Sequence, residues 1–146
     1  MTNDPNTSAP TDDPARRAWM RMSDLVLANE RRRAVAEALG MSFGRARAVR
    51  RVAKRAMTMG ELADALNIDR PNATTLVDGL EADGLVRRRP HPTDRRAKLV
   101  EATAKGQRLA RTADEILGTP PAALADLDPA DLEALNKILD RLISPP

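Results

Sequence analysis

The chain has 146 residues with no Cys, and 24 Lys and Arg against 21 Asp and Glu give a formal net charge of +3. This length suits one compact domain and argues against a multidomain enzyme. The absence of Cys excludes a disulfide framework, a thiolate nucleophile and a Cys-based zinc site, and no apolar stretch approaches the roughly 18 to 20 residues of a spanning helix, so we expect a soluble, cytoplasmic protein.

The charge is distributed unevenly along the chain. Residues 42–55 carry six cationic side chains and no carboxylate, and residues 84–98 carry six cations with Asp94 as the one carboxylate. Residues 112–146 reverse the sign, with seven carboxylates against two cations. Because phosphate contacts reward local rather than total positive charge, this pattern indicates a surface for a polyanion. Ordinary solvated helix faces are the alternative interpretation of the 42–55 run.

The N-terminal part of the chain predicts an arm followed by a helix. Residues 1–13 are rich in Pro, Asn, Thr and Asp, which predicts a disordered arm. From Pro14 to Leu39, apolar residues recur at helical spacing around the polar run 29–33, which predicts one long helix that Gly40 ends. A helix of this length exceeds what a small core can cover, so part of its apolar face is expected to meet a partner.

Two further helices are predicted from their caps and apolar faces. Ser42 suits the N-cap of a helix, whose inner face is predicted to consist of Ala46, Val49, Val52 and Ala53. Thr58 and Glu61 then form a capping-box pattern that opens a short helix, and its predicted buried residues are Leu62, Ala63 and Leu66.

A tight turn and a third helix follow. Residues 67–69 are typical of a turn, and Asp69 and Pro71 suit the cap and first turn of a helix that Gly84 ends. Its buried stripe is predicted to consist of Ala73, Leu76, Val77 and Leu80. The positions left outside the stripe are mostly short polar residues that can approach base edges: Arg70, Pro71, Asn72, Thr74, Thr75, Asp78 and Gly79.

After Gly84 the period changes from helical to extended. Residues 85–89 and 97–101 predict two strands, and the segment 90–94, with Pro on both sides of His91, predicts an irregular and exposed loop. Two short helices followed by a basic hairpin are in the order of a winged helix-turn-helix. In such a domain the second helix, here about 70–83, fits the major groove, while the wing, here about 87–98, reaches the adjacent minor groove.

The C-terminal part is predicted to be helical. Helix resumes near Thr103, breaks at 118–121 and returns after Asp128. The last helix carries an apolar stripe at helical spacing: Leu132, Leu135, Ile138, Leu139 and Leu142.

Several segments resemble the MarR family of bacterial transcription regulators: 60–70, 76–81, 84–88 and 94–106, within a similarity that runs over roughly residues 15–142. The resemblance implies a mainly α fold with a small β-hairpin wing, in which a winged helix-turn-helix domain (41–102) is flanked by N- and C-terminal dimerisation helices (14–40 and 103–146). It also implies a homodimer, a pseudo-palindromic DNA operator, and repression that in many members is relieved by a small ligand. That small-molecule effector would occupy the crevice between the dimerisation helices and the winged domain.

The resemblance and the charge pattern together give a set of site residues. The family pattern places Asp94 as a wing-stabilising residue paired with Arg96, which leaves Arg95 to enter the minor groove. The full predicted DNA-binding set is Arg70, Asn72, Thr74, Thr75, Arg88, Arg89, His91, Arg95, Arg96 and Lys98. Thr75 and Gly79 depart from the family pattern, which often has a large basic residue at these two positions.

The sequence therefore predicts a dimeric, sequence-specific DNA-binding regulator, expected to be a repressor. The Thr75 and Gly79 departures motivate an alternative, a dimeric winged-helix scaffold that binds a protein partner and has only non-specific DNA affinity. An enzyme is not expected, because we find no Gly-rich phosphate loop and no catalytic set, and a single His gives no His-based metal site. No cofactor is predicted.

Overall fold

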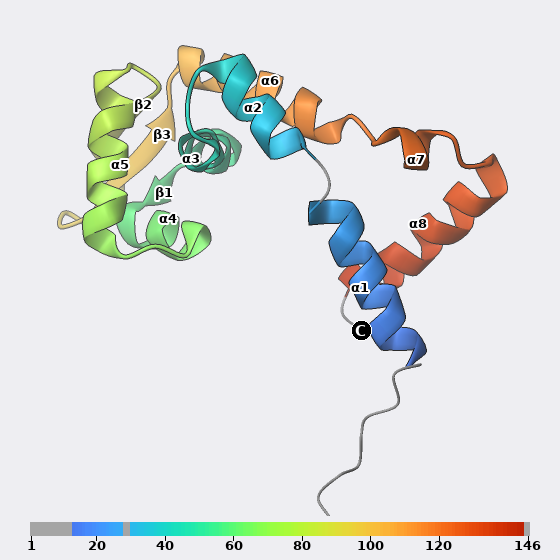
Figure 1. Cartoon of the computed structure of the whole chain (residues 1–146). Helices are drawn as coiled ribbons and strands as arrows, with labels where there is room; N and C mark the ends of the chain where they lie inside the picture. The colour runs from blue at the N-terminus through green and yellow to red at the C-terminus, as the bar shows by residue number, and fades with distance from the viewer. Residues whose placement is uncertain (1–12, 28–29, 145–146) are drawn as a thin grey trace, which may run out of the picture. The chain divides into compact units, whose positions relative to one another are not determined.

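The computed structural model of the chain describes residues 13–27 and 30–144, so the predicted arm lies almost wholly outside the described residues (Figure 1). The chain divides into two units, one up to Glu30 and one from Arg31 onward. The first unit contains α1 (Pro14–Leu27), and Asp13 caps this helix because its carboxylate accepts the N–H of Ala15 at 3.0 Å. The second unit contains all the other elements.

The predicted long helix is wrong in its continuity. The segment forms α1 and a separate α2 (Arg31–Leu39), and Glu30 lies in a turn. The polar run 29–33 offers no apolar residue to extend a buried stripe, so burial does not favour a continuous helix there. Gly40 ends α2 as predicted, in a left-handed conformation with φ of 63° that glycine adopts without strain.

The three helices of the winged domain begin at the caps that the sequence predicts. In α3 (Phe43–Lys54), the Ser42 hydroxyl accepts the N–H of Arg45 at 3.3 Å. In α4 (Met59–Leu66), both halves of the capping box between Thr58 and Glu61 are present. In α5 (Arg70–Ala82), the Asp69 carboxylate accepts the N–H of Asn72 at 2.8 Å.

A three-stranded antiparallel sheet completes this domain. The hairpin of β2 (Val86–Pro90) and β3 (Lys98–Ala102) confirms the predicted wing strands within one residue, and Arg88 faces Val100 in its register. Pro90, expected in the irregular loop, is instead the last residue of β2 and pairs with Lys98. The third strand, β1 (Met57–Thr58), was not predicted; it pairs with β3, which gives the order β1-β3-β2.

The C-terminal helices follow the predicted breaks. Thr103 caps α6 (Ala104–Gly118), and Asp128 caps α8 (Pro129–Ile143) by accepting the N–H groups of Ala130 and Asp131. Between them lies one short helix that the sequence analysis did not anticipate, α7 (Ala122–Ala125).

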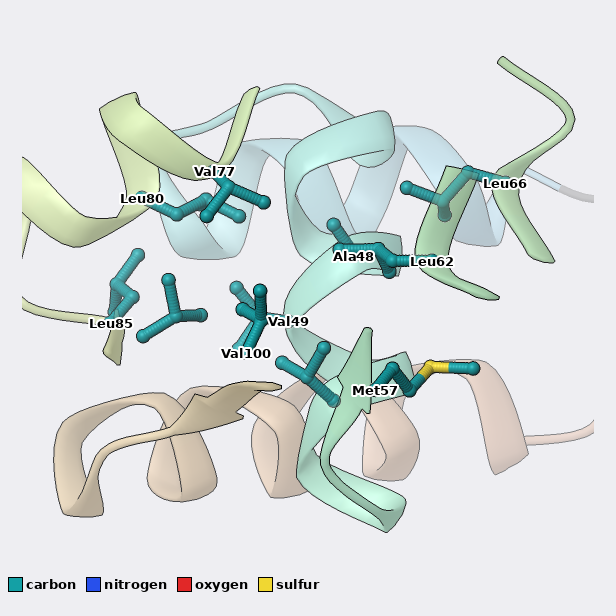
Figure 2. Packing of buried hydrophobic residues seen from close by; sticks show 11 residues of the cluster. Ala48, Val49, Met57, Leu62, Leu66, Val77, Leu80, Leu85 and Val100 are labelled. Atoms are coloured by element: carbon teal, nitrogen blue, oxygen red, sulfur yellow. The ribbon is translucent and has the colours of Figure 1, made fainter. Parts of the chain in front are cut away.

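The main core of the second unit surrounds α3. Helices α2 and α6 pack against α3, which also contacts α4, α5 and β3 (Figure 1). Figure 2 shows side chains of helices α3, α4 and α5 and of the sheet meeting in one apolar cluster, among them Val49 of α3, Leu62 of α4, Leu80 of α5 and Val100 of β3. A second, smaller cluster joins α2, α3 and α6 through Val35, Ala46 and Ala113.

The buried stripes predicted for α3 to α5 are largely confirmed. Ala46, Val49 and Val52 are buried, whereas Ala53 is only half-buried and the unpredicted Ala48 takes a place in the core. In α5, Ala73, Val77 and Leu80 are buried, and Leu76 is half-buried and packs against the main core, which contains Val77 and Leu80. The helix faces therefore follow from apolar periodicity, with errors at the edges of each stripe.

The start of α6 is held close to the start of β2. The Thr103 hydroxyl donates to the Gly84 carbonyl at 2.6 Å, and the Thr103 N–H donates to the Leu85 carbonyl at 3.1 Å. A Cβ atom at Gly106 would lie 2.0 Å from the Leu85 carbonyl oxygen, far inside van der Waals contact. Only glycine therefore permits this approach of helix to strand.

We predict that Gly106→Ala destabilises the fold by roughly 3 kcal/mol, because the helix must move away from the Leu85 backbone and open the core. Thermal unfolding followed by circular dichroism measures the effect. Gly118→Ala is the matched control on the same helix, since nothing lies within 4 Å of its Cβ position, and it should be neutral or slightly stabilising. Equal melting temperatures for the two variants would contradict the proposed contact.

Candidate nucleic-acid interface

The N-terminal half of α5 presents a polar face beside its buried face. Arg70, Asn72, Thr74 and Thr75 are exposed, whereas Ala73 between them is fully buried. The sequence-predicted residues on this helix thus lie together on its outer face. The Asn72 amide donates to the Asp69 carboxylate at 3.0 Å, so its side chain also supports the helix cap.

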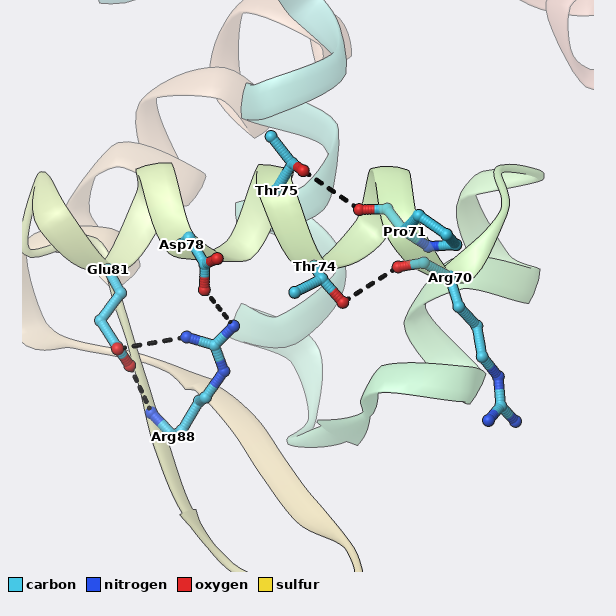
Figure 3. A network of polar contacts seen from close by, with 7 residues as sticks. All are labelled: Arg70, Pro71, Thr74, Thr75, Asp78, Glu81 and Arg88. Atoms are coloured by element: carbon cyan, nitrogen blue, oxygen red, sulfur yellow. Dashed lines mark hydrogen bonds and ion pairs between the residues drawn. The ribbon is translucent and has the colours of Figure 1, made fainter.

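The two threonines use their hydroxyl protons within the helix. Figure 3 shows that Thr74 donates to the Arg70 carbonyl at 3.0 Å and Thr75 donates to the Pro71 carbonyl at 3.1 Å. Each hydroxyl oxygen keeps acceptor capacity, and each side chain also presents a methyl group. These threonines therefore offer acceptors and methyl contacts in this conformation rather than donors.

The tip of the wing is ordered by its own polar side chains. His91 Nδ1 accepts the backbone N–H groups of Thr93 at 3.2 Å and Asp94 at 3.0 Å, so the imidazole closes the turn. The Asp94 carboxylate accepts the backbone N–H of Arg96 at 2.9 Å. The predicted pairing of Asp94 with Arg96 is thus a bond to the Arg96 backbone, and no carboxylate of the described residues pairs with the Arg96 guanidinium.

Two arginines of β2 share one carboxylate on β3. Arg87 Nε and Arg89 Nε each donate to Glu101 at 2.7 Å, across the register of the hairpin. The hydrogen bonds from Arg89 and Arg87 lower the pKa of Glu101 below its ordinary value of 4.5. Arg89 was predicted to contact DNA. In the structure, the carboxylate shared within the wing compensates part of its charge.

Arg88 is turned toward α5 rather than toward solvent. Its guanidinium pairs with the carboxylates of Asp78 and Glu81, and its backbone N–H donates to Glu81 at 3.0 Å (Figure 3). Only 20% of its side chain is exposed. Arg88, predicted as a DNA contact, therefore ties β2 to α5, and it is compensated by two carboxylates. The sequence analysis missed Asp78 and Glu81 as partners, although they lie one helical turn apart on α5.

Four other cations of this region have no carboxylate partner within residues 13–27 and 30–144: Arg70, Arg95, Arg96 and Lys98. Arg70 lies over the first turn of α4, where its guanidinium comes within 3.2 Å of the Cβ position of Gly60. All four side chains belong to exposed residues. These four cationic side chains are therefore available to bind an anionic ligand.

A concave surface of about 620 Å³ lies between the start of α4, the start of α5 and the wing. Its lining brings together residues that are distant in sequence: Thr58, Met59 and Gly60; Arg70 and Thr74; Arg88; Asp94, Arg96, Ala97, Lys98 and Val100. Arg70 and Thr74 of the predicted recognition helix therefore share one hollow with Arg96 and Lys98 of the wing. The arrangement suits a polyanion that contacts both elements at once.

Other classes of site find no support in the described part of the chain. No group of three or more His, Cys, Asp or Glu side chains is placed to hold a metal ion. No helix among the described residues is long and apolar enough to cross a membrane.

The fold is a winged helix-turn-helix with flanking helices, and it is similar to the folds of known proteins. Residues 39–97 match the model of the MarR family. The fold is similar to apo MarR from E. coli, with 21% identity and a TM-score of 0.68 over 90% of this chain and 98% of that one. It is also similar to Rv1404 from Mycobacterium tuberculosis (21%, TM-score 0.70, 94% and 99%) and to the transcriptional regulator BldR from Sulfolobus solfataricus (29%, TM-score 0.58, 87% and 91%).

These comparisons confirm the resemblance to the MarR family. The matched segment covers the end of α2, the three helices α3 to α5 and most of the wing. The structure has the fold of the MarR-family transcriptional regulators, a class of DNA-binding regulators and not of enzymes.

We predict that acid releases the two arginines from Glu101. Because the pKa of this carboxyl is lower in the folded protein, its pairs contribute stability above pH 4.5, and that contribution is lost as the pH falls through the lowered value. The Nε–H signals of Arg87 and Arg89 in NMR spectra should therefore move together as the pH falls from about 6 to about 3. In the Glu101→Gln variant, signals that still shifted over the same range would contradict the assignment.

Proposed function

We propose that this protein is a dimeric, sequence-specific DNA-binding repressor that acts in the cytoplasm. The observation that carries the proposal is the group of four exposed cations without a carboxylate partner among the described residues: Arg70, Arg96 and Lys98, which line the hollow beside the start of α5, and Arg95 in the wing. Helix α5 would enter the major groove, and the wing would reach the adjacent minor groove.

Direct readout of bases would rest on α5. Asn72, Thr74 and Thr75 are exposed near its N-terminus, where the backbone N–H groups also favour a phosphate. Asn can form two hydrogen bonds with adenine, and a Thr methyl suits contact with thymine. The side chain of Asn72 would have to leave the Asp69 carboxylate to read a base, whereas the two threonines can act as they stand.

The wing would supply most of the contact with the minor groove. Arg95 and Arg96 lie in a turn in which the Ala97 N–H donates to the Asp94 carbonyl at 3.2 Å and the Arg96 N–H donates to the Asp94 carboxylate at 2.9 Å, so the backbone of both arginines is already ordered. A pre-ordered wing loses less conformational entropy on binding than a mobile loop. Arg95 remains the first candidate for insertion into the groove, and His91 is assigned to the turn rather than to DNA.

Dimerisation would use the helices outside the winged domain. In α1, Trp19 is 65% exposed and Val26 is 61% exposed, and in α8, Leu142 is 67% and Ile143 is 76% exposed. Apolar side chains exposed in this number on one helix are typical of a surface that another chain covers. A two-fold dimer would present two winged domains to a pseudo-palindromic operator, and a small-molecule effector that binds beside the dimerisation helices would control release.

One set of contacts favours the alternative, a dimeric protein-interaction scaffold with only non-specific DNA affinity. Arg87, Arg88 and Arg89 are neutralised within the protein, and the hydroxyl protons of Thr74 and Thr75 are already used. Both features reduce what the surface offers for reading bases. The two proposals differ in selectivity, since a scaffold would bind all duplexes equally and weakly.

The repressor proposal predicts that Arg95→Ala combined with Arg96→Ala weakens duplex binding at least tenfold and lowers the slope of log K against log salt concentration by about 2. Fluorescence anisotropy with the chain's own upstream DNA and with unrelated DNA of equal length measures both quantities. Arg33→Ala combined with Lys137→Ala is the matched control, because it also removes two cations but from exposed i,i+4 pairs on α2 and α8. Equal losses in the two double variants would overturn the wing assignment.

The dimer proposal predicts that Ile138→Glu combined with Leu142→Glu yields a monomer with a melting profile for the winged domain close to that of the parent. Charge on the exposed apolar face of α8 would oppose its burial by a second chain. Size-exclusion chromatography with light scattering measures the mass. Glu133→Ala on the exposed polar face of α8 should leave the dimer intact, and a parent protein that is itself monomeric would refute the proposal.

A further inference from the structure

One arginine from outside the wing lies against the side of α5. Arg45 belongs to the first turn of α3, and its Nη2 atom pairs with the carboxylate of Asp83, the residue directly after α5. Its Nη1 atom lies 2.8 Å from the position that a Cβ atom at Gly79 would take. The Arg45 guanidinium therefore occupies the space in which a side chain at position 79 would begin, and the glycine makes this close approach possible.

Arg45 approaches α5 on a different side from the wing. Arg88 of the wing pairs with Asp78, which precedes Gly79 by one residue, and successive residues of an α-helix lie about 100° apart around the helix axis. Gly79 lies one turn after the exposed Thr75, so these two positions share one side of the helix. The outer face of α5 is thus bordered by Arg88 and the wing on one side and by Arg45 on the other.

The Arg45 guanidinium keeps N–H donors for a ligand. Its pair with Asp83 is the only hydrogen bond or ion pair that this side chain forms with residues 13–27 and 30–144, and a guanidinium has further donors beyond those of one such pair. Lys105 of α6 donates to the Asp83 carbonyl at 2.8 Å and has no carboxylate partner in the same part of the chain. Two cations therefore surround one carboxylate, and the group keeps a net positive charge.

From this placement we propose that Arg45 is a further DNA contact, which binds a backbone phosphate on the side of α5 opposite to the wing. The inference rests on the proposed entry of α5 into the major groove. Because the guanidinium lies beside the α5 backbone at Gly79, it faces the wall of that groove, where the phosphates lie, and not the base edges at its floor. A guanidinium binds a phosphate through parallel hydrogen bonds, and Asp83 would hold the guanidinium in the orientation that this contact needs.

Two charge variants with opposite expected effects test the proposal, with duplex binding of the chain to its own upstream DNA followed by fluorescence anisotropy. Arg45→Ala should weaken binding at least tenfold, because it removes the contact and leaves the Asp83 carboxylate unpaired beside a phosphate. Asp83→Asn should bind as tightly as the parent or more tightly, since it removes that carboxylate and keeps Arg45. If the pair only held α3 to α5, both variants would weaken binding, and this result would overturn the proposal, as would unchanged binding by Arg45→Ala.

Gly79→Ala displaces the guanidinium without removing a charge. The new Cβ atom would meet the Nη1 atom of Arg45, which is the end of a flexible side chain, so the helix keeps its packing. We expect duplex binding to weaken about threefold, while the melting temperature stays equal or rises because alanine favours a helix interior over glycine. Gly118→Ala is the matched control, with nothing within 4 Å of its Cβ position, and should bind as the parent does. Equal affinities of the two variants would contradict the position assigned to Arg45.

Duplexes that carry one uncharged methylphosphonate at a time in place of a phosphate locate the contact. At a phosphate that Arg45 binds, the substitution should weaken binding of the parent several-fold and leave Arg45→Ala combined with Asp83→Asn unaffected. These positions should differ from those that Arg95→Ala combined with Arg96→Ala makes insensitive. A parent that binds its upstream DNA selectively but shows no such position would overturn the Arg45 contact alone, whereas a parent that binds no duplex would overturn the proposed function and this inference together.

Discussion

The burial of α3 is the constraint on which the rest of the second unit depends. Its buried residues are all small, Ala46, Ala48, Val49 and Val52, so the helix can lie close to its neighbours on several sides. Helices α2, α4, α5 and α6 and strand β3 all contact it. The packing of α3 against the buried side of α5 therefore sets the position of the exposed face of α5. An exchange of these small residues for larger ones would separate the elements that form the candidate nucleic-acid interface.

The same requirement makes two sides of α3 differ in residue type. The side that faces the core must be small and apolar, whereas Arg47, Arg50, Arg51 and Lys54 line a hollow on the outer side. A helix at the centre of a fold would normally expose little surface, yet Arg51 and Lys54 of α3 are exposed. The remaining cations of the run 42–55 lie elsewhere, because Arg45 pairs with Asp83 and Arg55 pairs with Glu61.

Local signals in the sequence predicted most of the elements. Ser42, Thr58, Asp69, Thr103 and Asp128 each cap a helix through bonds to residues at most three positions away, so short-range patterns suffice to find them. Strand β1 could not be found in this way, since its two residues count as a strand only through pairing with β3 some forty residues later. The long-helix prediction failed for a related reason, because apolar spacing alone does not show where a helix is interrupted.

The roles of the wing arginines were the least predictable part of the candidate site. Counting charges treats Arg87, Arg88, Arg89, Arg95 and Arg96 as equivalent, but the structure separates them by what each one faces. Carboxylates reached through the fold, on α5 and on β3, neutralise the three arginines of β2.

The different partners of the wing arginines bear on how this surface would recognise DNA. The compensated arginines fix the angle between wing and α5, because Arg88 is bound to two carboxylates one helical turn apart. The uncompensated cations lie at the tip of the wing and at the start of α5, where they can contact phosphates on either side of a groove. Electrostatic attraction would therefore be concentrated at the tip of the wing and at the start of α5, whose relative position is fixed. Binding strength would then depend on how well the groove width of a duplex matches the distance between these two places, rather than on the number of arginines in the sequence.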